Sequence, residues 1–152
     1  MNTRNLAIAT VSGAVLTTFV SNVPFLGLVN CLLCAGFWGS AIFAVWLYRR
    51  LSGTTTTQQS LTIGAITGAL AGALGFALSF AGVTGLQGLM NTTGGFLPPD
   101  ATKGMTDIPA WGAVVFNLMG VVFNIMFGTL GGWLAGVIFN RKAKPALQDN
   151  PA

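Results

Sequence analysis

The chain has 152 residues, of which 53% are hydrophobic and 7% are charged, and it contains no His. Soluble domains carry about 25% charged residues, so this composition, with a mean hydropathy of +0.72, excludes the soluble, disordered and fibrous classes. The absence of His and Glu also excludes His-ligated metals, Ser-His-Asp catalysis and carboxylate pairs built on Glu. We therefore expect an integral membrane protein that is not an enzyme and has no catalytic residues, metal site or cofactor.

Four apolar stretches reach the length of about 20 residues that a membrane-spanning helix needs. None contains Asp, Glu, Lys or Arg, and each is continuously apolar rather than alternating, which favours helices over β-strands. The sequence thus predicts an all-α polytopic membrane protein with four transmembrane helices in a single domain over residues 1–144. Residues 145–152 are expected to form a flexible cytoplasmic tail. The predicted spans are 6–25, 28–48, 61–84 (with room to extend to 90) and 111–139.

An internal similarity relates the first and third spans. Residues 6–15 and 61–70 align without gaps and share Leu, Ile, Gly and Ala at matched positions, and the second and fourth spans align more weakly from their basic ends. The simplest interpretation is a repeated helical hairpin, with hairpin 1 at about 6–48 and hairpin 2 at about 61–140. The two copies would be related by an axis along the membrane normal. The alternative is that Gly- and Ala-rich helices resemble each other by composition alone.

Positive charge is concentrated on one side of the predicted spans. The loop between the third and fourth spans carries one Lys and two Asp, whereas the segments on the other side are basic. The positive-inside rule therefore predicts a multi-pass protein of the cell inner (cytoplasmic) membrane with both termini and the central loop in the cytoplasm. This topology explains the basic balance without a nucleic-acid partner. The residues that determine the orientation are Arg4, Arg49, Arg50, Arg141, Lys142 and Lys144.

Glycines form two regular arrays in the third and fourth spans. Residues four apart lie on one face of a helix, and Gly there lets two backbones approach closely, which drives helix association in lipid. Such a glycine zipper either packs the four helices into one bundle or docks one face on a neighbouring subunit or a copy of the chain. A Gly-lined pore is a third, less favoured case. The helix-packing glycines are Gly64, Gly68, Gly72, Gly128, Gly132 and Gly136.

Two amides, Asn117 and Asn124, lie seven residues apart on nearly one face of the fourth span. Hydrogen bonds between helices are the favoured interpretation of such residues, and the lining of a path for water or a polar substrate is the alternative. The spans carry no charged side chain, which proton pumps and ion-coupled transporters usually need. We therefore do not expect an active transporter.

A CxxC pair, Cys31 and Cys34, lies at the outer end of the second span. Its position resembles that of the CxxC in four-helix membrane thiol-oxidoreductases of the disulfide-bond-formation type. Those enzymes need a second cysteine pair, and this chain has two Cys in total. Two reduced, buried thiols are therefore the favoured interpretation, with a structural disulfide and a redox pair as alternatives.

Two loops complete the chain. Residues 91–110 are rich in Gly and Pro, which excludes a regular helix, and their length favours a docking loop. The segment 52–59, with four consecutive Thr, is expected to be a plain linker on the cytoplasmic side.

Residues 23–34, followed by a Gly-containing span that ends in Tyr-Arg-Arg, resemble a pattern in small uncharacterised prokaryotic membrane proteins. The resemblance implies four spans and Gly-rich repeats, and it implies no activity. We expect a non-catalytic accessory or scaffold subunit that packs within a larger membrane protein complex. Its partners would be the lipid bilayer and other membrane subunits or copies of itself. A self-associating passive channel or small-molecule permease is the alternative, and a thiol-redox protein that uses the CxxC is a weaker one.

Overall fold

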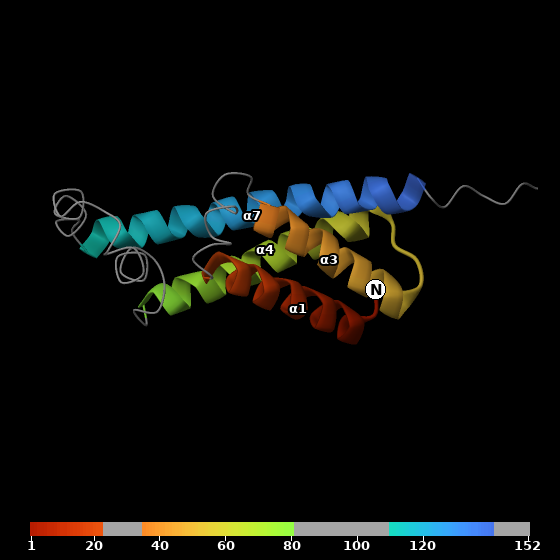
Figure 1. Ribbon diagram of the computed structural model, residues 1–152, viewed down its shortest axis with the longest axis horizontal. Helices are drawn as coiled ribbons and strands as arrows, with labels where there is room; N and C mark the ends of the chain where they lie inside the picture. Colours follow the sequence, from red (N-terminus) through yellow and green to blue (C-terminus); the bar gives the residue numbers. More distant parts are fainter. Residues whose placement is uncertain (23–34, 81–109, 142–152) are drawn as a thin grey trace, which may run out of the picture.

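The computed structural model describes residues 1–22, 35–80 and 110–141, and all regular structure within these ranges is helical (Figure 1). The all-α prediction is confirmed for this part of the chain. The helices are α1 (Thr3–Asn22), α3 (Ala35–Ser52), α4 (Thr57–Phe80) and α7 (Ala110–Arg141).

Two of these helices are long and apolar enough to cross a membrane. They are the segments Thr57–Ser79 in α4 and Asn117–Asn140 in α7. The first two predicted spans, at 6–25 and 28–48, extend into residues 23–34, which lie outside the described ranges. Within the described residues the fold is therefore all-helical with two candidate membrane helices.

One end of the bundle brings together four helix termini. Asn5, near the start of α1, donates from Nδ2 to the carbonyl of Leu51 at the end of α3 (3.1 Å). Asn140, near the end of α7, donates from Nδ2 to Oγ1 of Thr57 at the start of α4 (3.0 Å). Helix α1 is thus antiparallel to α3, and α4 is antiparallel to α7. Figure 1 shows this end on the right, with the N-terminus beside the α3–α4 connection. We call it the basic end, because Arg4, Arg49 and Arg50 lie there.

The connection between α3 and α4 is shorter and more ordered than the sequence predicts. Helix α3 ends where Gly53 adopts a φ of 88° and donates its N–H to the carbonyl of Arg49 (2.8 Å), which is a glycine C-cap. Helix α4 begins with a capping box: Gln59 N donates to Oγ1 of Thr56 (3.2 Å), and Thr56 N donates to Oε1 of Gln59 (3.1 Å). The prediction of a linker over 52–59 is therefore wrong for residue 52 and for residues 57–59, which are helical.

The interior of the bundle consists mostly of small side chains. Each buried Ser or Thr hydroxyl within a helix lies 2.8 to 3.1 Å from a backbone carbonyl about one turn earlier in the chain. The hydroxyls of Thr17 and Ser40 also pair with each other, so one of these two donates across to the other helix. Polar atoms are thereby satisfied without water, so the helices can pack closely. Besides glycines, the buried residues are Ala9, Thr10, Ala14, Thr17, Ser40, Ala41, Ala44, Val45, Tyr48, Ser60, Ile63, Thr67, Ala71 and Ala135, together with Thr55 in the α3–α4 connection.

Candidate functional site: the α4–α7 contact and the outer face of α7

The closest helix contact in the described residues is between α4 and α7, where the two glycine arrays meet. A Cβ added to Gly128 would lie 2.5 Å from the carbonyl oxygen of Gly64 and 2.9 Å from Cα of Gly68. A Cβ on Gly132 would lie 3.0 Å from Cα of Gly64 and would collide with the carbonyl oxygen of Ser60. The backbones of the two helices are therefore in direct contact, and no side chain fits between them.

The contact continues less tightly toward both ends of the arrays. A Cβ on Gly72 would lie 3.0 Å from Cα of Val121, and one on Gly136 would lie 3.2 Å from Cγ2 of Thr57. Both glycine arrays thus face each other along α4 and α7 within one chain. Of the two interpretations of the arrays, this geometry supports the intramolecular one, because neither array face is free to dock elsewhere.

Two further glycines allow α3 and α1 to pack closely on the rest of the bundle. A Cβ on Gly131 would lie 2.6 Å from the carbonyl oxygen of Trp38, so α3 packs directly on α7. A Cβ on Gly13 of α1 would lie 2.8 Å from Cγ2 of Thr67 and 2.9 Å from Cβ of Ala44, between α4 and α3. Sequence reasoning did not assign these two to packing. The signal for Gly13 was its alignment with Gly68 in the internal similarity.

The two amides predicted to bond between helices both lie half-buried on α7. Asn124 is half-buried, and its Nδ2 donates to the carbonyl of Gly120 in the same helix (2.8 Å). Gly68 packs against the backbone carbonyl oxygen of Asn124. Asn117 is also half-buried, two turns earlier on α7. The Asn124 side chain therefore bonds back to α7 at the edge of the glycine contact.

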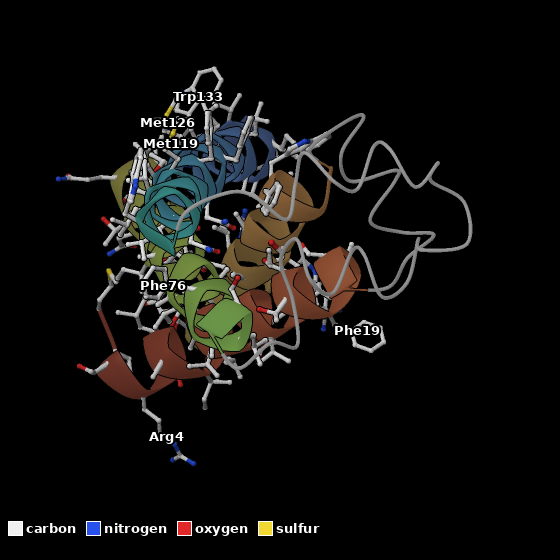
Figure 2. The ribbon with its side chains drawn as sticks, turned by 90° about the vertical axis from the view of Figure 1, so that its left-hand side faces the viewer. Arg4, Phe19, Phe76, Met119, Met126 and Trp133 are labelled. Carbon is white, nitrogen blue, oxygen red and sulfur yellow. The ribbon has the colours of Figure 1, made fainter. Side chains whose placement is uncertain are left out.

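The surface of α7 directed away from the other helices carries a continuous row of large apolar side chains. Met119, Met126 and Trp133 follow one another at seven-residue spacing, and Figure 2 shows all three projecting from the same side of α7. Each is about half exposed, at 53%, 53% and 48%. We call this surface the outer face of α7. Its members are Val115, Leu118, Met119, Val122, Phe123, Met126, Leu130 and Trp133.

Comparison with protein-family models, with curated proteins and with solved structures finds no match. The resemblance of residues 23–34 to a family of small membrane proteins stays a prediction, and these residues lie outside the described ranges.

Several predicted features fall on residues that the structure does not describe. Cys31 and Cys34, residues 91–109 of the predicted outer loop 91–110 and the predicted tail 145–152 all lie there. The last residue of that loop, Ala110, is instead the first residue of α7. Among the residues that are described, no group of three or more His, Cys, Asp or Glu side chains could hold a metal ion.

Proposed function

We propose that the chain is a multi-pass integral membrane protein that acts as a non-catalytic accessory or scaffold subunit of a larger membrane complex. Membrane insertion is supported by the distribution of side-chain size. The interior is built mostly from Ala, Gly, Ser and Thr, and most of the large apolar side chains of α7 point outward. Helix association in lipid relies on such close small-residue contacts, because lipid tails are as apolar as Leu.

The proposed topology has four spans in two hairpins, with the basic end in the cytoplasm. Support comes from the position of Arg4, Arg49 and Arg50 at one end of the bundle, together with the termini of all four helices. Cationic side chains near short loops are retained on the cytoplasmic side.

The observation that carries the proposed role is the outer face of α7. From Val115 to Trp133 this face runs about 27 Å at 1.5 Å per residue, close to the thickness of the hydrocarbon core, which is about 30 Å. It contains Met119 and Met126, and the flexible, polarizable Met side chain is over-used at protein-binding surfaces. A helix of another subunit could therefore pack along its whole length.

The interior supports a packing role rather than transport by a single chain. Most of its hydroxyls bond back to nearby carbonyls of their own chain segment, and the described spans carry no charged side chain. Coupled transport usually requires such charges.

Site-specific photo-crosslinking in native membranes tests the role. A photoreactive residue is placed at Val122 on the outer face of α7, and a matched control is placed at Val11 on α1. Both valines are about half exposed, at 57% and 51%. We expect position 122 to yield adducts with one defined membrane protein at fixed stoichiometry, and position 11 to yield mainly lipid adducts.

Each other outcome counts against the scaffold role. Lipid adducts alone at position 122 would reject it, and an adduct with a second copy of the chain would favour self-association, with liposome flux as the next assay. Release of the chain from membranes by alkaline carbonate would reject membrane insertion itself.

A further inference from the structure

An open groove of about 360 Å³ lies at the basic end, where α3 and α7 finish. Its lining consists of Trp46, Arg49, Arg50, Gly53 and Phe139. Two guanidinium groups and two aromatic rings thus converge on one concave surface. The positive-inside rule accounts for Arg on this side of the protein, but it does not require the cations to line a groove or to stack on rings.

The side chain of Arg49 is held in place by α7. Its Nη1 donates to the carbonyl of Phe139 (2.8 Å), and its guanidinium carbon lies 5.6 Å from the centroid of the Phe139 ring. A guanidinium has five N–H donors in a rigid fork. The bond to Phe139 satisfies a carbonyl in the last turn of α7, which reduces the negative potential of that helix end, and other N–H groups are left for an anion.

The side chain of Arg50 is positioned by an aromatic ring of its own helix. Its guanidinium carbon lies 5.4 Å from the centroid of Trp46, a cation–π distance. The chain contains three acidic residues, all Asp, and they stand at positions 100, 107 and 149, outside the described ranges. Among the described residues, no carboxylate is therefore present to neutralise either Arg.

Apolar surface continues from the groove along α3. The rings of Phe43 and Trp46 stack with centroids 5.8 Å apart, and both side chains are exposed, at 36% and 40%. A ligand with a phosphate at the groove and a hydrocarbon chain along these rings would use both surfaces. Free phosphate would use only the first.

We propose that this groove binds the phosphate of an anionic phospholipid from the leaflet at the basic end, with an acyl chain against Phe43 and Trp46. Basic pockets between membrane helices on the cytoplasmic side bind acidic headgroups in this way, and Arg pairs with phosphate through its planar fork. The inference rests on the proposed membrane insertion. It adds a specific lipid ligand to the proposed scaffold role.

The test is native mass spectrometry of the full chain, extracted in mild detergent with equal amounts of phosphatidylglycerol and phosphatidylcholine. We expect preferential retention of phosphatidylglycerol. Arg50→Gln should lower the ratio of bound phosphatidylglycerol to phosphatidylcholine about fivefold. Arg4→Gln is the matched control, because Arg4 lies at the same end, its exposed side chain projects away from the helices (Figure 2), and the variant loses the same charge. Its ratio should stay close to that of the unmodified chain.

A second variant separates charge from geometry. Arg49→Lys keeps the charge but loses the planar fork, so the ratio should fall without a change in net charge. Helical circular dichroism checks that each variant is folded.

Three results would overturn the lipid site. They are equal retention of the two lipids by the unmodified chain, an equal fall with Arg4→Gln and Arg50→Gln, and displacement of phosphatidylglycerol by millimolar inorganic phosphate. The carbonate extraction described above separates the two proposals. A chain that stays in the membrane but shows no lipid preference refutes only the lipid site.

Discussion

Replacing Gly128 by Ala is the most direct test of the α4–α7 contact. The added Cβ would lie 2.5 Å from the carbonyl oxygen of Gly64, and real Cβ contacts rarely fall below 3.4 Å. The two backbones would therefore have to separate by about 0.9 Å. No flexible side chain can yield, since the neighbouring atoms belong to the backbone.

The expected loss of stability follows from this displacement. Overpacking a close contact costs about 1–3 kcal/mol, and the opposing gain in helix propensity from Gly to Ala is about 1 kcal/mol. The displacement also weakens the neighbouring contacts of Gly68 and Gly132, so the cost should lie at the upper end of its range. We expect Gly128→Ala to lower the free energy of unfolding by about 1–2 kcal/mol.

Two glycines on the same helices provide matched controls. A Cβ at Gly75 of α4 or at Gly120 of α7 would meet no atom within 4 Å. Ala at either position should leave stability unchanged or raise it by up to about 1 kcal/mol. The assay is reversible unfolding in mild detergent, followed by circular dichroism.

The test compares the free energies of unfolding of Gly128→Ala and of the control Gly75→Ala. If Gly128→Ala is as stable as Gly75→Ala, the backbones of α4 and α7 are not in contact, and the argument from the glycine arrays fails.

Three further substitutions test smaller features by the same unfolding measurement. The buried hydroxyl of Thr55 has no hydrogen-bond partner among the described residues, so Thr55→Val should raise stability by about 1 kcal/mol; a loss would indicate a partner. The hydroxyls of Ser40 and Thr17 lie 2.5 Å apart, and Ser40→Ala should cost about 0.6 kcal/mol; a neutral result would refute that link between α1 and α3. Asn5→Ala removes two hydrogen bonds to the last turn of α3, so it should speed amide hydrogen exchange at the end of α3 and lower stability by only about 0.5 kcal/mol.

The sequence was sufficient to predict the helices, because their apolar runs are long and continuous. Its predictions were less accurate at the helix ends. Four consecutive Thr indicated a linker, whereas Thr56 and Gln59 form a reciprocal cap and α4 begins at Thr57. A capping box is visible in the sequence, since it needs Thr and Gln three residues apart, but the repeated Thr obscured which residue was the cap.

The partners of the small-residue faces could not be predicted from spacing. A Gly array shows that a backbone will approach, but the same pattern suits another helix of the chain or a second copy. The internal similarity was an incomplete guide for the same reason. Gly13 and Gly68, which align, both lie in tight contacts. When Arg49 is aligned with Arg141, Gly39 of the second span aligns with Gly131 of the fourth. Gly39 has open space at its Cβ position although Gly131 packs on Trp38, because each contact depends on which helix lies opposite.

The α4–α7 pair has a consequence for the order of assembly. These are the two described helices apolar enough to cross a membrane by themselves, and they also share the closest backbone contact. Under the proposed membrane insertion, these two helices would insert independently and associate first, as a core for the rest of the chain. Helices α1 and α3 would then pack on surfaces that the pair already presents, with Trp38 against Gly131 and Gly13 against Thr67. Helices α1 and α3, although they are synthesised first, would thus complete their packing only after α4 and α7 have been made.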